Sequence, residues 1–230
     1  MQFLEIALYL AMDTPKSLPI LNAEQIRVLG ALMEKCKTTP DYYPMTLNGL
    51  AAACNQKTSR KPVVQYDEST IVTALNSLKI AGLIATATGG SIRTIKYKHN
   101  FAIVYPLVPA EVAVMCLLFL RGPQTPGEIN TNSGRLYEFE TLEEVQSVLE
   151  KLASEEPPYL KQLPRRPGQK EQRYMHLFGG DIEAFEEEYV TSEETPGKSN
   201  SELEERLGKV ETELAELKAK LEELMKELGV

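Results

Sequence analysis

Two successive parts of this chain have the same order of segments: three helical segments, then two β-rich runs around a turn. The spacing of apolar residues and the turn residues place the first copy at residues 23–37, 47–54, 68–81, 83–88 and 91–97. The second copy has a helical segment, a short helix and a longer helix, then two runs, at residues 110–120, near 121–128, 142–154, 159–163 and 172–178. This order predicts two winged helix-turn-helix domains that repeat in architecture, with little residue identity between them.

Local signals support these segments. Asn22 and Asp67 are placed to cap the first and third helices, and Gly82 is placed to end the third. The pair Thr141 and Glu144 predicts a capping box at the last helix of the second copy. Each of these helices therefore has a defined start or stop as well as the right periodicity.

A heptad repeat near the C-terminus predicts a coiled coil. Its apolar positions alternate in steps of four and three residues: Leu203, Leu207, Val210, Leu214, Leu217, Leu221, Leu224 and Leu228. With Leu207 as an a position, Arg206 faces Glu211 and Glu213 faces Lys218 in a parallel partner. Opposite charges at these positions favour a parallel homodimer, while leucine at both a and d leaves trimers and larger bundles open. A helix docked on its own chain is the alternative.

The predicted fold class is α+β, mainly α, and the charge is divided unevenly along it. We divide the chain into an apolar extension, two winged-helix domains, an acidic linker and a coiled-coil helix, at residues 1–20, 21–105, 106–180, 181–200 and 201–230. Residues 1–100 hold 11 Lys and Arg against 7 Asp and Glu, whereas residues 181–230 hold 6 against 16. The overall charge of −8 therefore does not exclude nucleic-acid binding by the first domain.

No pattern in the sequence indicates catalysis, a cofactor or a metal. The three cysteines lie in apolar helical patterns without paired spacing, and neither His99 nor His176 has a cysteine at metal-ligand spacing. There is no phosphate-binding glycine loop, and no triad can be assigned. Residues 1–12 are too short to span a bilayer and lack the features of a signal peptide. We therefore predict a non-enzymatic cytoplasmic protein that uses no cofactor and no membrane.

The first domain contains the better candidates for binding double-stranded DNA. The third helix of a winged helix can read bases, and its polar positions here are Ser69, Thr70, Thr73 and Asn76. The loop before it and the first hairpin hold the cations expected to contact phosphates: Lys57, Arg60, Lys61, Arg93, Lys96 and Lys98. This helix has only one cation of its own, Lys79, so a plain solvated face remains the alternative.

The second hairpin is also basic, but the helix before it is acidic. Four cations surround Pro167 and Gly168, namely Arg165, Arg166, Lys170 and Arg173. These suit a phosphate backbone or an acidic partner protein. The helix at residues 142–154 would bring Glu143, Glu144 and Glu150 against phosphates, which disfavours base reading. The second domain is therefore expected to be a protein-facing or dimerising module rather than a reader of DNA.

Three separated strings resemble the hallmark stretches of the YceH-type family, a group of uncharacterised bacterial proteins with tandem winged helices. They are TTPDYYPMTLNGLAAACNQKTSRKPV at residues 38–63, LRGPQTPGEI at 120–129 and PRRPGQKEQRYMHLFGGD at 164–181. The resemblance covers residues 21–181 and implies the tandem winged-helix fold. It implies no activity, ligand or catalytic residue. The apolar N-terminal segment and the heptad repeat lie outside it.

Together these observations predict a homodimeric DNA-binding protein with a regulatory or architectural role. The alternative is a non-enzymatic adaptor whose partner is another protein, since winged helices also bind proteins. A continuous positive stripe over the loop, third helix and hairpin would favour DNA, and a broken stripe with an exposed apolar patch would favour the adaptor.

Overall fold

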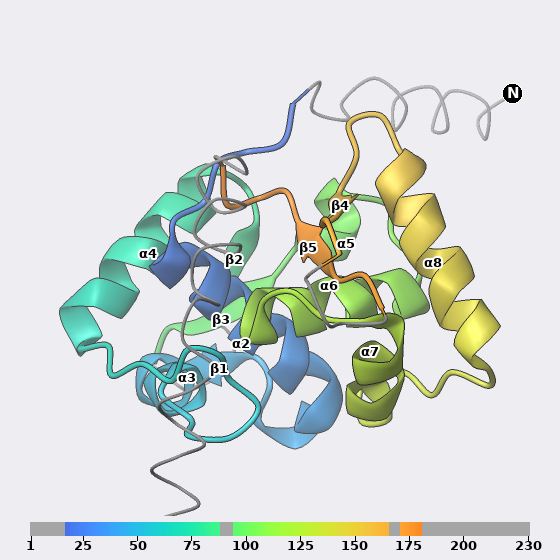
Figure 1. The fold of residues 1–230 in the computed structure, drawn as a ribbon. Helices are drawn as coiled ribbons and strands as arrows, with labels where there is room; N and C mark the ends of the chain where they lie inside the picture. Colours follow the sequence, from blue (N-terminus) through green and yellow to red (C-terminus); the bar gives the residue numbers. More distant parts are fainter. Residues whose placement is uncertain (1–16, 88–93, 166–170, 181–230) are drawn as a thin grey trace, which may run out of the picture. The chain divides into compact units, whose positions relative to one another are not determined.

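A computed structural model describes residues 17–87, 94–165 and 171–180 (Figure 1). The described part is α+β and mainly helical, as expected from the sequence. Its first half runs through α2 (Ala23–Thr38), the 3-10 turn η1 (Pro40–Tyr42), β1 (Met45–Thr46), α3 (Leu47–Cys54), α4 (Glu68–Ile80), β2 (Ile84–Ala87) and β3 (Lys96–His99). Its second half runs through α5 (Phe101–Val104), α6 (Pro109–Arg121), α7 (Pro126–Ser133), α8 (Leu142–Ser154), β4 (Leu160–Gln162) and β5 (Tyr174–His176).

Side-chain caps start the main helices where the sequence predicts them. The side chain of Asn22 accepts a hydrogen bond from the backbone N–H of Gln25, and that of Asp67 accepts from Thr70. The capping box predicted at α8 is only half formed. Thr141 accepts from the N–H of Glu144, but the Glu144 carboxylate accepts from the N–H of Glu140. The helix start is unchanged, because one side-chain cap satisfies an otherwise orphan N–H.

The described strands form two small antiparallel sheets, one in each half. The first has the strand order β1-β3-β2, with Met45 opposite Tyr97 and Ile84 opposite His99. The second pairs β4 with β5, and a single bridge joins Gln124 to Tyr174. In the first half, β1 lies between α2 and α3 and pairs with β3. In the second half, Gln124 lies between α6 and α7 and pairs with β5. The two halves therefore share this pairing.

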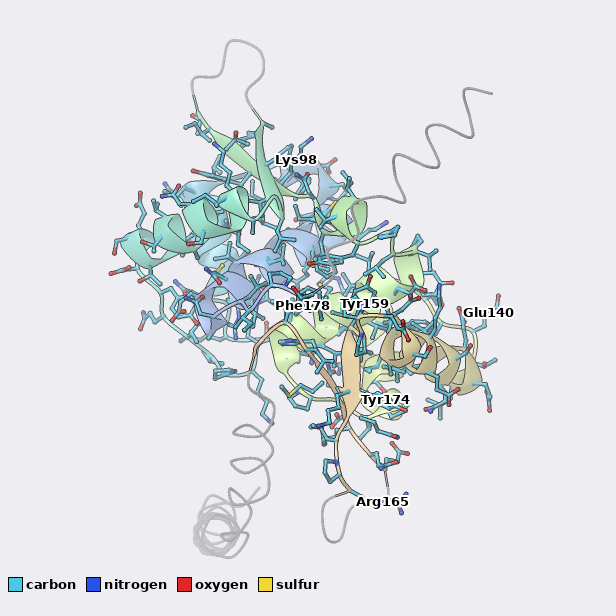
Figure 2. All side chains as sticks on the ribbon, turned by 90° about the horizontal axis from the view of Figure 1, so that it is seen from above. Lys98, Glu140, Tyr159, Arg165, Tyr174 and Phe178 are labelled. Carbon is cyan, nitrogen blue, oxygen red and sulfur yellow. The ribbon has the colours of Figure 1, made fainter. Side chains whose placement is uncertain are left out.

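The two halves share one hydrophobic core. Helix α2 packs closely against α6, and a Cβ atom added at Gly30 would lie 3.0 Å from Leu120 and Phe119 of α6. Phe178 lies in a cluster of aromatic rings, with ring centroids 5.4 Å from Phe101 and 5.2 Å from Tyr105. Figure 2 shows Phe178 and Tyr159 close together, near the middle of the part of the chain that the structure describes. The backbone N–H of Leu21 donates to the Phe178 carbonyl at 2.7 Å, which ties the end of the second half to the start of the first.

None of the helices in the described ranges has the length and apolar character needed to cross a membrane.

Candidate functional site

The exposed face of α4, the helix predicted to read bases, carries polar side chains as the sequence predicts. Ile71, Leu75 and Leu78 are buried on the inner face of this helix. The predicted base-reading residues Ser69, Thr73 and Asn76 are exposed on the outer face, while Thr70 is half-buried. The Thr73 hydroxyl donates to the Ser69 carbonyl, so its oxygen can still accept a hydrogen bond. The structure therefore presents hydroxyl and amide groups along one helix face.

The predicted lysines of the first hairpin lie on β3, in the sheet that follows α4. Lys96 and Lys98 share one face of the strand, because side chains alternate along it. Their cross-strand neighbours on β2 are Ala87 and Ala85, and Lys98 is exposed (Figure 2). No carboxylate in the part of the chain that the structure describes forms an ion pair with either lysine. Within that part, both ammonium groups are therefore available to an anion.

The sequence predicts that Arg60 contacts phosphate, and the structure corrects that prediction. The Arg60 side chain is 0% exposed, and Nη1 and Nη2 donate to the two oxygens of Glu34 at 3.0 and 2.6 Å. Nη2 and Nε also donate to the Ala53 carbonyl. A guanidinium that is buried and fully engaged cannot reach a ligand outside. Arg60 instead holds the loop at residues 55–66 against α2, while its neighbours Lys57 and Lys61 are exposed.

A second buried guanidinium supports the same loop. Arg27 on α2 donates to the carbonyls of Cys54 and Pro62, at 3.1 and 2.6 Å. Burial and the nearby charge of Arg60 lower the pKa of Arg27. Burial alone would raise the pKa of Glu34, but the hydrogen bond and charge of Arg60 outweigh it and hold that pKa below its usual value. The loop is thus anchored by three charged groups of the interior.

The second hairpin provides fewer free cations than its sequence suggests. Arg165 is exposed and lies next to β4. Arg173, however, donates through Nη1 and Nη2 to Glu128 at 2.6 and 2.8 Å, and through Nη1 to the Pro123 carbonyl. Burial would raise the pKa of Glu128, but the hydrogen bonds from Arg173 and from the backbone of Thr125, together with the charge of Arg173, outweigh it and lower that pKa. This arginine thus joins the start of α7 to β5, and its contact with nucleic acid stays a prediction.

The two hairpins do not form one surface. Figure 2 shows Lys98 on the β2–β3 hairpin and Arg165 beside the β4–β5 hairpin at opposite sides of this unit. Between them in the chain, α8 exposes Glu143 and Glu150. Lys98 and Arg165 therefore do not belong to one positive surface, and the exposed carboxylates make the outer face of α8 acidic.

A cleft lies between the two halves of the described chain. No local pattern in the sequence predicts it. It has a volume of about 330 Å³, and its nine lining residues include Ser59, Lys61, Arg121, Gln124, Glu128 and Arg173. The first wall is the loop at residues 55–66, where the backbone N–H of Lys61 donates to the Leu120 carbonyl at the end of α6. All three strings that carry the family resemblance contribute residues to this cleft. Their separation in sequence conceals their common location.

Several predicted residues lie outside the described ranges. These are Arg93 of the first hairpin, Arg166 and Lys170 of the second, and the heptad positions Leu203, Leu207, Val210, Leu214, Leu217, Leu221, Leu224 and Leu228. Their predicted roles stay predictions.

The buried thiols offer no activated nucleophile within the described ranges. Burial raises the pKa of the Cys54 thiol to about 12 and also raises that of Cys116, so both remain protonated. Within the same ranges, no group of three or more His, Cys, Asp or Glu side chains is placed to hold a metal ion.

Comparison with known proteins places the chain in a family. Residues 21–169 match the family model described as "Protein of unknown function, DUF480". The chain belongs to this family. It is 47% identical over 179 residues to a UPF0502 protein of Opitutus terrae, a match that covers 77% of each chain. It is 52% identical over 167 residues to a UPF0502 protein of Solibacter usitatus, covering 73% of this chain and 80% of that one.

A third relative, a UPF0502 protein of Pelobacter propionicus, is 46% identical over 177 residues, or 77% of this chain and 80% of its own. These family names agree with the resemblance to YceH-type proteins found in the sequence. The family model covers most of the two halves and of their common cleft, but its description assigns no activity to them.

Proposed function

We propose that this DUF480 protein is a non-enzymatic DNA-binding protein built on two tandem winged helices. In this proposal the first half binds double-stranded DNA and has a regulatory or architectural role. The observation that carries the proposal is the exposed polar face of α4 in the same half as the lysines of β3. The second half, with acidic α8, supports the first rather than reading DNA.

The sheet topology supports the winged-helix assignment. In the first half, β1 lies between α2 and α3 and pairs with β3, as expected when a short strand joins the two-stranded wing. In the second half, Gln124 lies between α6 and α7 and bridges to Tyr174 of β5. The order of helix, short strand or bridge, two helices and hairpin is therefore the same in both halves.

The chemistry of the first half suits contact with a duplex. Asn76 can donate and accept in the bidentate pattern that reads adenine. The hydroxyls of Ser69 and Thr73 donate to the Asp67 carboxylate and to the Ser69 carbonyl, so their oxygens can accept from a donor on a base edge. Lys96 and Lys98 add two cations on β3 of the same half, where phosphate contacts would provide affinity without sequence preference.

We also propose that two copies pair through the heptad repeat at residues 203–228. A parallel pair would place two first halves on one duplex and raise their joint affinity. The opposite charges at the positions flanking the apolar seam favour this pairing.

An adaptor that binds another protein is the second candidate, and two exposed isoleucines favour it. Ile80 at the end of α4 is 89% exposed, and Ile103 on α5 is 78% exposed. Large apolar side chains left in water are typical of protein interfaces when they form a patch. DNA and adaptor functions differ in their dependence on Lys96 and Lys98, and this difference can be measured.

The test is fluorescence anisotropy of a random duplex titrated with the full chain at several salt concentrations. We expect affinity that falls steeply with salt, because phosphate contacts release counterions. In the variant Lys96→Ala/Lys98→Ala, affinity should fall. The slope of log affinity against log salt should decrease by about 2, because two phosphates would no longer be neutralised by a lysine.

The matched control removes the same charge from the second half through Arg135→Ala/Arg165→Ala, two exposed positions. This variant should bind the duplex nearly as tightly as the parent. Equal losses of affinity in the two variants would contradict binding by the first half. The absence of any binding at low salt would reject the DNA proposal and leave the adaptor.

A further inference from the structure

The cleft between the two halves holds positive charge that the described residues do not balance. Four of its nine lining residues are Lys or Arg, and one is a carboxylate. Glu128 is engaged by Arg173, and Arg60 is engaged by Glu34. Lys61 and Arg121 remain, and across residues 17–87, 94–165 and 171–180 no carboxylate forms an ion pair with either one.

The guanidinium of Arg121 is positioned at the wall of this cleft. Its Nη2 donates to Ser59 Oγ at 3.0 Å, and both residues line the cleft. This hydrogen bond uses one of the five N–H donors of an arginine. Arg121 therefore keeps further donors for a ligand while its position is fixed by the opposite wall.

A buried hydrogen-bond donor lies in the same cleft. Gln124 lines it but is only 3% exposed. Its Oε1 accepts from Asn132 Nδ2 at 3.0 Å, whereas its Nε2 has no acceptor in the described part of the chain. The backbone of Gln124 is fixed by two hydrogen bonds with Tyr174, so the residue is held in place beside the cleft. Folded proteins rarely leave a buried amide donor unpaired, which indicates a missing acceptor.

We propose that this cleft binds the phosphate group of a small molecule. Lys61 and Arg121 supply two positive charges, which match a phosphate dianion better than a single carboxylate. Gln124 lines the same cleft, with an Nε2 donor that the described residues leave unpaired. The volume of about 330 Å³ lies in the range of small-molecule sites and is far smaller than a duplex requires.

Such a ligand would bridge the two halves. Its contacts come from the loop at residues 55–66 in the first half and from the end of α6 and its connection to α7 in the second. Because it binds only where these walls meet, it would stabilise the folded unit in proportion to its occupancy. This site does not rest on the proposed DNA binding, and it can be tested with no DNA in the solution.

The experiment is a thermal unfolding titration of the full chain with inorganic phosphate and, separately, pyrophosphate, at ionic strength held constant with chloride. We expect a saturable rise in Tm with one of these probes. Arg121→Gln and Lys61→Gln should each weaken the fitted affinity by about tenfold or more, because each removes one charged donor. The matched control is Lys57→Gln, an exposed lysine of the same loop that does not line the cleft, and it should bind as the parent does.

Gln124→Glu separates a ligand-binding role from a structural one. The substituted side chain keeps an oxygen for Asn132 and places a negative charge near Lys61 and Arg121. Without ligand, its Tm should equal or exceed that of the parent, whereas its stabilisation by phosphate should be lost. A purely structural glutamine would instead lower the Tm and leave the response to phosphate unchanged, which would overturn the proposal.

Two further results would overturn it. One is the absence of a saturable response to either probe, and the other is equal affinity in Arg121→Gln and Lys57→Gln. If free phosphate does not bind but Arg121→Gln weakens binding of a duplex, the two cations belong to the DNA surface and the small-molecule site is rejected.

Discussion

At the scale of single residues, both histidines of the chain are shielded from solvent. His176 is 8% exposed and packs edge-on against Phe119, with ring centroids 4.9 Å apart. His99 is half-buried, and its backbone N–H donates to the Tyr43 hydroxyl at 2.7 Å. Burial lowers the pKa of each imidazole from 6.5 to about 4, with a smaller contribution from Lys37 at His99. Both rings are therefore neutral in the folded protein at neutral pH.

These pKa values predict acid sensitivity in a defined window. Below pH 6.5 the unfolded chain binds protons at both histidines that the folded chain does not. The free energy of unfolding is therefore unaffected by these histidines above pH 6.5 and decreases as the pH falls toward 4. The free energy of unfolding in urea should differ between pH 7.5 and pH 5.0 by about 1–2 kcal/mol for each histidine. The carboxylates with lowered pKa, Glu34 and Glu128, stabilise the fold at neutral pH, and they add to the pH dependence only below about pH 4.5, where that stabilisation is lost.

The variant His176→Phe keeps an aromatic ring beside Phe119 and removes one of the two titrating groups. Its loss of stability between pH 7.5 and 5.0 should be smaller than that of the parent by the contribution of one histidine. An unchanged pH dependence would mean that the pKa of His176 is the same in the folded and unfolded chains, contrary to its burial.

The burial of individual arginines cannot be predicted from the sequence. Arg60 and Lys61 are adjacent, yet one is buried against Glu34 and the other is exposed. The partner of Arg60 lies 26 residues away, and the partner of Arg173 lies 45 residues away. Local pattern identifies a basic loop, but only the tertiary fold decides which cations are neutralised. For the same reason the cleft, whose walls come from three separate segments, has no local signal.

At the scale of secondary-structure elements, the contact between α2 and α6 joins the two halves and depends on Gly30. A Cβ atom at this position would lie 3.0 Å from Leu120 Cδ2 and from Phe119 Cβ, tighter than normal side-chain contacts. The Cys116 thiol also approaches the Gly30 carbonyl, at 3.5 Å. The absence of a side chain here lets the two helices pack closely.

We therefore predict that Gly30→Ala destabilises the protein although alanine is the better helix former. Helix propensity would favour alanine by about 1 kcal/mol. Overpacking at a buried helix contact costs about 1–3 kcal/mol, so we expect a net decrease in the free energy of unfolding measured in urea.

Gly134→Ala is the matched control, because Gly134 ends α7 with a φ of −53° and nothing lies within 4 Å of a Cβ atom there among the described residues. That substitution should be neutral or stabilising by up to about 1 kcal/mol. If both variants are equally stable, the helices do not pack as closely as the structure has them.

The longer helices are predictable because their periodicity and caps agree. Helices α2, α3, α4, α6 and α8 begin and end within a few residues of the predicted segments. The two-residue strand β1 and the four-residue helix α5 are not predicted, since elements this short are defined by what they pack against. Strand β3 continues to His99, beyond the predicted end at Tyr97, because His99 pairs with Ile84 of β2.

At the scale of the whole molecule, the two halves of the described unit share one core but differ in the surfaces they present. The first half exposes the hydroxyls and amide of α4 and carries Lys96 and Lys98 on β3. The second half exposes the carboxylates of α8, and its hairpin points away from the first (Figure 2). In our proposal this asymmetry gives DNA contact to one half and a supporting role to the other.

The most direct test is to map amide chemical shifts of the isotope-labelled full chain during titration with a short duplex. We predict shifts concentrated in α4 and β3, around Asn76 and Lys98, with α8 unchanged. Shifts concentrated in α8, or none at all at low salt, would contradict the assignment of DNA binding to the first half.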